Sequence, residues 1–423
     1  MNIIINPDFS EFENICKRPS FDQKHLSSGV QTIFDEINRR GDQALIEYTE
    51  KYDNVKIKST VLNLNDEQVE ISSALKEAIQ VAYQNIKTFH EAQKPLEINV
   101  SVMHGINCSQ KPIPIQNVGV YIPGGTAPLF STVLMLCIPA KLAGCKRILL
   151  CTPPDKSGNI HPAILYAAQL CGVKEIRLAG GAQAVAAMAL GTAEIQKVDK
   201  IFGPGNQYVT AAKQLAQNYG VSIDMPAGPS ELLVYADSTA ISSFVAADLL
   251  SQAEHGSDSQ VVLIATTEKM VKDIFNEIES QLEVLPRKNI AKEALKNSKF
   301  VVITDASKAF DLINHYAPEH LIIASDSPEQ YVDLILNAGS VFLGNYCPES
   351  AGDYASGTNH TLPTNGWAKN YSGVNMDAFY KKVTFQSITK QGIENLGQTI
   401  ITMAEGEALQ AHANAVKVRL NQK

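Results

Sequence analysis

Histidines and carboxylates recur together toward the end of this 423-residue chain. Four of its nine histidines lie beyond residue 314, and three of them share short segments with acidic residues: Glu319-His320, Asp353 to His360, and Glu407 to His412. Farther upstream, His255 follows Gln252 by three positions. Zinc binds histidine nitrogen and carboxylate oxygen, and an adjacent imidazole and carboxylate suit proton transfer and water activation. These residue types favour an enzyme that uses a metal, a general base or both.

Gln252 and His255 lie near the end of a helix expected from about residue 241 to residue 253. Side chains three residues apart on a helix share one face, so the two could hold one metal ion. Glutamine is an unusual zinc ligand, however. A histidine at a helix C-terminus beside a polar neighbour explains the pair as well.

The next acidic residues also allow two interpretations each. Glu319 and His320 begin an expected strand, where consecutive side chains point to opposite faces. They could serve two ends of one substrate, or they could be an exposed glutamate beside a half-buried histidine. Asp353 follows Gly352 in an expected loop, from which a carboxylate can reach a metal or cap a turn.

Glu407 and His412 are five residues apart in an expected C-terminal helix. On a helix this spacing separates two side chains by roughly 140°, so they cannot share a narrow face. The helix carries one apolar stripe, which needs a surface to pack on. The stripe consists of Leu409, Ala413, Val416 and Leu420. An interface histidine is therefore the alternative role for His412.

Three glycine-rich turns follow expected strands: residues 123–128, 179–183 and 202–206. Ligands of open α/β sheets bind at the carboxyl ends of strands, where a helix N-terminus also favours phosphate. None of the three turns matches G-x-G-x-x-G, because the most similar segment ends in Tyr208. The pattern alone does not assign NAD, and each turn could simply connect a strand to a helix.

The elements that must position these residues form two series. The first hundred residues predict amphipathic helices, for example over 30–39 and 74–93. From residue 118, short β-rich segments alternate with apolar helices, and a second such series follows residue 228. This alternation predicts an α/β fold with two Rossmann-like modules, parallel sheets, and helical segments at both ends of the chain.

Composition excludes several classes of protein. Lysine and arginine number 36 against 44 acidic residues, a net charge of −8, which argues against binding to nucleic acid and favours a small ligand. The seven cysteines are scattered, as expected in a reducing cytoplasm. No segment has the length and apolarity of a membrane span. No Gly-x-Ser-x-Gly elbow supports serine catalysis, and no cysteine has a catalytic context.

Several long strings together resemble the histidinol dehydrogenase family, from about residue 118 to the C-terminus. The strings occupy residues 119–125, 203–206, 224–231, 251–256, 317–321 and 352–360, and read GVYIPGG, GPGN, DMPAGPSE, SQAEHG, APEHL and GDYASGTNH. Ordered, mutually consistent strings are far more specific than any single spacing. The first hundred residues carry no diagnostic string, so the resemblance there concerns fold only.

The resemblance implies a role for each matched residue. Catalysis is assigned to Glu319 and His320. The implied ligands of one zinc ion per subunit are Gln252, His255, Asp353 and His412, with His412 coming from the partner chain of a homodimer that exchanges its tails. The implied NAD contacts are Tyr121, Gln183 and Asn206. The implied substrate contacts are Ser230, His360 and Glu407, together with the zinc ligands and His320. His315 is left as a structural residue.

The activity implied is the oxidation of L-histidinol to L-histidine through L-histidinaldehyde, with two NAD, at the end of histidine biosynthesis. We expect four segments: a helical segment 1–20, a discontinuous α/β domain of 21–117 with 231–374 carrying the metal and catalytic residues, an inserted NAD-contacting domain 118–230, and a helical tail 375–423. Two rival functions are a zinc hydrolase, which leaves the glycine turns without a role, and a non-catalytic sensor of an imidazole compound.

Overall fold

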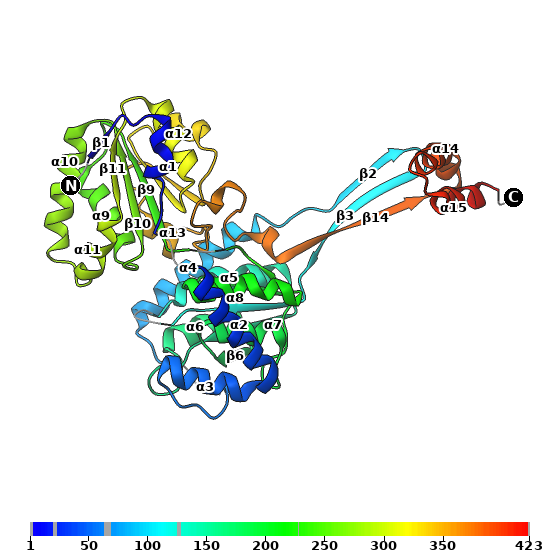
Figure 1. Cartoon of the computed structure of the whole chain (residues 1–423), viewed down its shortest axis with the longest axis horizontal. Helices are drawn as coiled ribbons and strands as arrows, with labels where there is room; N and C mark the ends of the chain where they lie inside the picture. Colours follow the sequence, from blue (N-terminus) through cyan, green and yellow to red (C-terminus); the bar gives the residue numbers. More distant parts are fainter. Residues whose placement is uncertain (1–2, 20–22, 63–68, 125–127, 227, 422–423) are drawn as a thin grey trace.

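The computed structural model consists of two α/β modules and a long arm that projects from them (Figure 1). It describes residues 3–19, 23–62, 69–124, 128–226 and 228–421. Gly125, Thr126 and Ala127 of the first glycine turn lie outside the described residues, as does Ala227.

The first module contains a five-stranded parallel sheet in the order β6-β5-β4-β7-β8. Its elements are β4 (Asn117–Tyr121), α5 (Phe130–Ala143), β5 (Arg147–Thr152), α6 (Pro162–Cys171), β6 (Glu175–Leu178), α7 (Gly181–Leu190), β7 (Lys200–Phe202), α8 (Gln207–Ala216), η2 (Gln217–Tyr219) and β8 (Ser222–Ile223). Helices α5 and α6 cover one face, and α7 and α8 cover the other. The strand order reverses between β4 and β7, the crevice in which such folds bind ligands.

Three N-terminal helices complete this first module: α2 (Gln23–Arg40), α3 (Asp42–Asp53) and α4 (Ser73–Glu91). Ile79 and Ile86 of α4 join the core beneath α5, and Phe34 of α2 and Leu45 of α3 join the core beneath α7. The sequence led us to group residues 21–117 with residues 231–374. In the structure these helices pack on the first module instead, because their apolar stripes cover its two helical layers.

The second module is built on a six-stranded parallel sheet in the order β1-β11-β10-β9-β12-β13. Its elements are β1 (Ile3–Ile5), η1 (Phe9–Glu11), α1 (Phe12–Ile15), β9 (Glu231–Ala236), α9 (Ser242–Ala253), β10 (Gln260–Ala265), α10 (Glu268–Leu282), α11 (Lys288–Lys296), β11 (Lys299–Val302), α12 (Ala306–Tyr316), β12 (His320–Ala324), η3 (Pro328–Leu334), β13 (Ser340–Leu343), α13 (Glu349–Tyr354) and η4 (Trp367–Lys369). The short helix η5 (Met376–Phe379) instead packs on α5, in the core of the first module. Residues 3–15 therefore begin with an edge strand of this sheet, where a helical segment was expected.

The two predicted Rossmann-like modules are confirmed, since strands β9 to β13 repeat the order of strands β4 to β8. Strands β9 and β10 are buried along their whole length, as expected of a parallel sheet covered on both faces. Helices α9, α10 and α11 cover one face, and α1 and α12 cover the other. Helices α11 and α12 were not anticipated from the sequence.

The arm is a three-stranded antiparallel ribbon with two helices at its tip (Figure 1). Strands β2 (Ile98–Met103), β3 (Ile106–Pro114) and β14 (Tyr380–Ile388) pair in the order β14-β3-β2, and α14 (Lys390–Gly406) and α15 (Gln410–Leu420) follow. The tail is therefore not wholly helical, because β14 pairs with β3 over nine positions. Ala413 and Val416 of the predicted stripe pack on α14 within the same chain. None of the described helices is long and apolar enough to cross a membrane.

Candidate active site

The candidate site lies where opposite edges of the two sheets face each other. In the first module the glycine turns follow the carboxyl ends of β4, β6 and β7. In the second module, Glu231 and His320 stand at the amino ends of β9 and β12. A cavity of about 620 Å³ lies between these edges and is lined from both modules. Its lining includes Asn206, Gly228, Ser230, His255 and Asn365.

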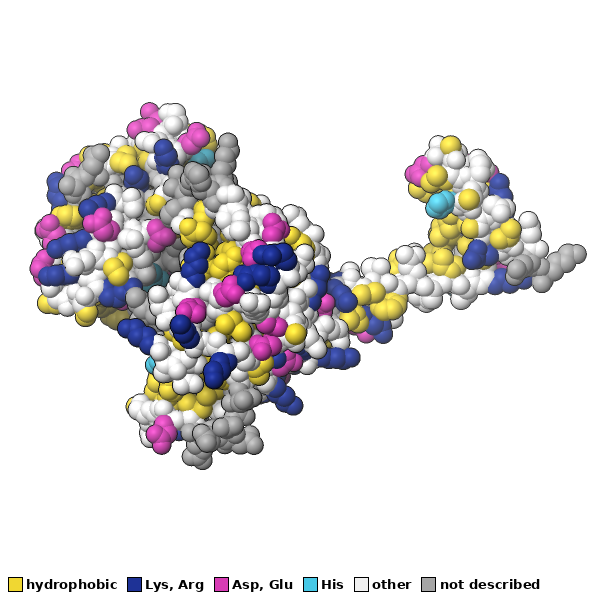
Figure 2. All heavy atoms as spheres, turned by 60° about the horizontal axis from the view of Figure 1, so that its bottom comes forward, with side chains coloured by type: hydrophobic (Ala, Val, Ile, Leu, Met, Phe, Trp, Pro, Cys, Tyr) yellow, Lys and Arg dark blue, Asp and Glu magenta, His cyan; other side chains and the backbone are white. Residues whose placement is uncertain are grey.

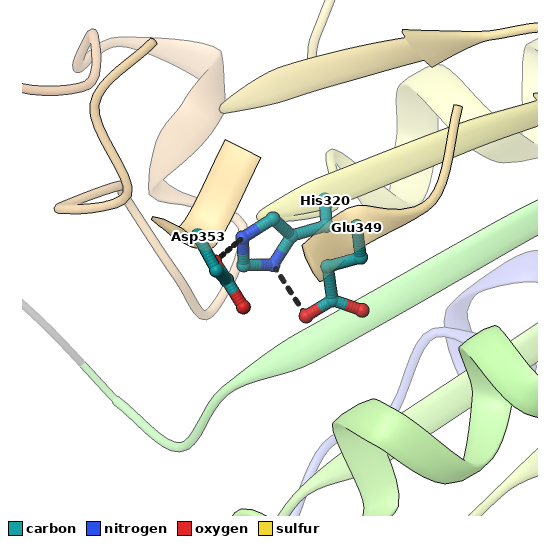
Figure 3. A group of neighbouring side chains, drawn as sticks. All are labelled: His320, Glu349 and Asp353. Carbon is teal, nitrogen blue, oxygen red and sulfur yellow. Dashed lines mark ion pairs between the residues drawn. The ribbon is translucent and has the colours of Figure 1, made fainter. Parts of the chain in front are cut away.

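His320 lies at the centre of a buried cluster of carboxylates (Figure 3). Its Nε2 is 3.6 Å from Oδ1 of Asp353, and its Nδ1 is 3.6 Å from Oε1 of Glu349. On the Nδ1 side it also donates a hydrogen bond of 3.2 Å to the backbone oxygen of Glu231. One ring nitrogen therefore faces Asp353, while the other faces the strand and Glu349.

These neighbours change the acidity of the whole cluster. Burial by itself lowers the pKa of His320, but the surrounding carboxylates, Glu349 foremost, raise that pKa to about 10. Burial raises the pKa of Glu349 well above its ordinary value. For Asp353 the hydrogen bond and charge of His320 outweigh burial, so its pKa is lowered. In the metal-free chain the imidazole of His320 is therefore protonated at neutral pH, and the neighbouring carboxylates stabilise its charge.

Glu319 is buried directly before β12, with its Oε2 3.7 Å from Nδ1 of His320, which rules out the exposed glutamate considered from the sequence. Its Oε2 accepts a hydrogen bond of 2.9 Å from the backbone nitrogen of Glu231. Burial raises the pKa of Glu319 to about 7, against the lowering effect of His320. Glu231 itself pairs with Arg18, which donates to both carboxylate oxygens at 2.5 and 2.9 Å. Arg18 thereby ties the N-terminal segment to the strand that orients Glu319.

Gln252 and His255 lie together at the end of α9, as their spacing predicts. The amide nitrogen of Gln252 is 3.2 Å from Nδ1 of His255. The amide oxygen of Gln252 is buried and has no hydrogen-bond partner in the described part of the chain. A buried oxygen without a partner, beside an imidazole and near a carboxylate, suits a bound cation.

Asp353 lies in α13, where a loop was expected, and its carboxylate faces His320. A helix at this point also brings in Glu349, which the sequence analysis did not single out. His320, Glu349 and Asp353 offer ligand atoms within 4.8 Å of one another. The only sequence signal for Glu349 is a glutamate four residues before Asp353, which places both on one helical face.

His360 holds the two modules together beside the site. Its Nδ1 donates to the backbone oxygen of Asp353 at 2.8 Å, and its Nε2 accepts from Oγ1 of Thr132 in α5 at 3.1 Å. Ser230 lines the cavity directly before β9.

Glu407 and His412 do not join this cluster within one chain. Both are exposed at the tip of the arm, away from the two modules (Figure 1). The expectation that they share one helix is wrong, because α14 ends at Gly406 and α15 begins at Gln410. Ala408 between them has a φ of 58°, which reverses the chain. The angle of roughly 140° derived for a continuous helix therefore does not apply.

The residues implied to contact NAD line a second cavity, of about 880 Å³, in the first module. The Tyr121 hydroxyl accepts a hydrogen bond of 3.0 Å from the backbone nitrogen of Gly181, and Gln183 is buried in α7. Asn206 caps α8 through its side-chain oxygen. At Gly203, with φ of 133°, a Cβ atom would collide with the carbonyl of Tyr121, so only glycine permits this close turn.

Comparison with known proteins identifies the family of this chain. The family model described as histidinol dehydrogenase matches residues 16–420. The chain belongs to the histidinol dehydrogenase family. It is 54% identical to histidinol dehydrogenase of Bacteroides thetaiotaomicron over 426 residues, covering 100% of this chain and 99% of that one. It is 51% identical to the chloroplastic enzyme of Arabidopsis thaliana, covering 97% and 89%.

A solved structure of histidinol dehydrogenase from Elizabethkingia anophelis is similar over the whole fold. The TM-score is 0.96 at 56% sequence identity, and the match covers 99% of this chain and 98% of that one. Membership in the histidinol dehydrogenase family makes this chain an NAD-dependent oxidoreductase of histidine biosynthesis.

For this histidinol dehydrogenase family member, we expect Glu349→Gln to lower the pKa of His320 in the metal-free protein. The substitution removes the ionisable carboxyl group 3.6 Å from Nδ1 that contributes most to raising the pKa of His320. The folded-state pKa of His320, about 10, lies above its ordinary value. The stabilisation from the cation is thus present at low pH and lost as the pH rises through that value, and the loss moves to lower pH in the variant. Imidazole NMR titration measures the change.

Glu329→Gln is the matched control, because Glu329 is exposed on η3 beyond the other end of β12. It should leave the His320 titration as in the unsubstituted protein. Equal titration curves for the Glu349 and Glu329 variants would contradict the assignment of Glu349 as a principal charge partner.

Proposed function

We propose that this chain oxidises L-histidinol to L-histidine through L-histidinaldehyde, with two NAD and one water. The observation that carries the proposal is the buried Glu319-His320 pair. Both residues bond the backbone of Glu231, directly after Ser230 of the cavity that Asn206 and His255 line from opposite modules. Asn206 lines both this cavity and the larger one of the first module. A cofactor in the first module and a substrate in the second can therefore meet there.

His320 is the proposed general base of both oxidations. It would accept the alcohol proton as hydride leaves the carbon, and later a proton of the hydrated aldehyde; NAD, when bound, accepts the hydride in each step. The hydrogen bond from Nδ1 to the backbone of Glu231 fixes the ring and leaves Nε2 for the substrate. To act as a base the ring must be neutral. Another positive charge must therefore counteract the neighbouring carboxylates, which raise the pKa of His320.

Glu319 is the proposed base that activates the water attacking the aldehyde. Its pKa of about 7 suits removal of a proton at neutral pH. The hydrogen bond from the backbone of Glu231 holds one carboxylate oxygen, so the other is left for water. Separate bases for oxidation and hydration allow the intermediate to react in place.

We infer that one zinc ion binds to Gln252, His255 and Asp353, with His412 supplied by a second copy of the chain. The unpartnered amide oxygen of Gln252 supports this ligand set, and nitrogen and oxygen donors suit zinc. When bound, zinc would hold the substrate's amino and imidazole nitrogens, as in the family, and its charge beside His320 would lower the pKa of that imidazole. Ser230, His360 and Glu407 are the further proposed substrate contacts.

A homodimer that exchanges its arms is proposed from the exposure of the arm. Its ribbon presents apolar side chains to solvent, and Figure 2 shows hydrophobic atoms along it. Exposed members are Ile98, Val100, Val102, Met103, Val383, Phe385 and Ile388. An exposed apolar patch of this kind on a projecting element marks a protein interface.

The seven free thiols support a reducing compartment such as the cytoplasm.

The activity is tested by incubating the protein with L-histidinol and NAD. We expect two NADH per histidine formed, no product without NAD, and loss of turnover on chelation that added zinc reverses. A zinc hydrolase would act on its substrate without NAD, and a sensor would bind histidinol without forming NADH. Either result would contradict the proposal.

The division of roles predicts different defects for two variants. His320→Asn should slow both the alcohol and the aldehyde oxidation by about 10²- to 10⁴-fold, the usual contribution of a general base. Glu319→Gln should mainly slow the step from aldehyde to histidine, with the first hydride transfer near normal. Single-turnover NADH formation from histidinol and from histidinaldehyde separates the steps. Equal losses of both steps in the Glu319 variant would contradict this assignment.

Arm exchange predicts that two inactive variants restore each other. When His320→Asn and His412→Asn chains are co-expressed in equal amounts, half of the dimers are hybrids with one intact site. Activity should then reach about a quarter of the unsubstituted value. The matched control combines His320→Asn with Glu319→Gln, whose lesions lie in the same half-site, and should show no recovery. No recovery in the first pair would mean that His412 does not act across chains.

A further inference from the structure

Asp53 is a carboxylate in the larger cavity, and none of the roles assigned above involves it. It is the last residue of α3, and its side chain lines the cavity with Tyr121, Gly181 and Asn206. Its Oδ2 is buried and has no hydrogen-bond partner among the described residues. A negative charge at a helix C-terminus is also unfavourable, because the helix dipole is negative there. A residue with two such costs is retained for a ligand more readily than for folding.

The position of Asp53 along the sheet indicates which part of the cofactor it meets. Strand order places β7, followed by Asn206, on one side of β4, and β5 and β6 on the other. Asn206 marks the end where the cavity meets the substrate, so the nicotinamide belongs there. Asp53 lies at the opposite end, beside Gly180, which follows β6, and Pro153, which follows β5. A Cβ atom built on Gly180 would stand 3.4 Å from Oδ1 of Asp53 and 2.7 Å from Cβ of Pro153.

In dinucleotide-binding modules, an acidic residue near the end of the second strand of the sheet accepts hydrogen bonds from the adenosine ribose. The second strand of this module is β5, which ends at Thr152 and is followed by two prolines. The nearest acid in that segment is Asp155, whose Oδ1 already accepts from Ser157 and Asn159. Asp155 therefore serves its own loop through Oδ1, whereas Asp53 reaches the same place from α3 with a buried, unpartnered Oδ2.

We propose that Asp53 accepts hydrogen bonds from the vicinal hydroxyls of the adenosine ribose and excludes a 2′-phosphate, which selects NAD over NADP. This rests on the proposed function only in taking the cavity as the NAD site. Burial raises the pKa of Asp53 to about 6, so the carboxylate is ionised at neutral and alkaline pH. Two basic residues, Lys156 and His161, also line the cavity. Nδ1 of His161 accepts a hydrogen bond from the backbone nitrogen of Ala163 and so caps α6.

The test is Asp53→Asn, assayed with NAD and NADP and titrated with two half-molecules of the cofactor. We expect KM for NAD to rise about 10-fold or more with kcat and the KM for histidinol little changed, since one charge-assisted hydrogen bond is lost. The ratio of kcat/KM for NADP to that for NAD should rise at least about 10-fold, because a like-charge contact is removed. By calorimetry, ADP should bind about 10-fold more weakly and nicotinamide mononucleotide equally well.

Asp155→Asn is the matched control, because it changes the same residue type in the same cavity while its carboxylate serves its own loop. It should leave the cofactor ratio unchanged. An unchanged ratio and ADP affinity in Asp53→Asn, or weaker binding of nicotinamide mononucleotide instead of ADP, would overturn the proposal. The melting temperature of the unliganded Asp53 variant should equal or exceed that of the unsubstituted protein, and a large fall would make Asp53 a structural residue.

These outcomes remain separate from the proposed function. ADP binding is measured without turnover, so a chain that binds ADP but does not oxidise histidinol would contradict the activity and leave the ribose contact standing. A chain that oxidises histidinol normally, with the Asp53 variant indistinguishable from it, would contradict the ribose contact alone.

Discussion

The concentration of buried negative charge around His320 is the constraint on which the second module depends. Glu319, Glu349 and Asp353 all approach this imidazole, and burying a carboxylate is costly unless it is paired and hydrogen-bonded. A backbone N–H group and the side chain of Arg18 offset part of this cost. The N–H of Glu231 bonds Glu319, and Arg18 neutralises Glu231 from the N-terminal segment. Glu349 keeps both oxygens without a hydrogen-bond partner in the described chain, which identifies it as the least compensated member.

Two modules of the same strand order are used from opposite edges. The first module offers the carboxyl ends of its strands, with the turn at Gly203 held by a buried ion pair between Lys213 and Asp224. The second module offers the amino ends, so its own carboxyl-edge crevice plays no part in the site. In that crevice the Asp237 carboxylate is already bonded by Ser325 and Thr239. The fold therefore does not by itself say which edge reacts; the placement of side chains does.

Much of this arrangement could be predicted from the sequence. Periodicity identified both parallel sheets, and the family strings named residues that lie close together in the structure, such as Gln252 with His255 and His320 with Asp353. Spacing alone misplaced Glu407 and His412 on one helix, because a single residue with positive φ, Ala408, splits it. Glu349 escaped notice because its helix, α13, has only six residues, too few for a periodic signal. The packing of α2 to α4 was missed because an apolar stripe does not say which sheet it covers.

The path of the chain through the two modules constrains how the molecule is assembled. Strand β1 pairs with β11, and Arg18 pairs with Glu231, yet the whole first module lies between these partners in the sequence. As the chain emerges during synthesis, the first module has all its strands once residue 223 is made. Strand β1 is synthesised before the first module and is among the last elements to find its place. It must stay unpaired, with three consecutive isoleucines, until more than two hundred residues later its neighbour in the sheet exists.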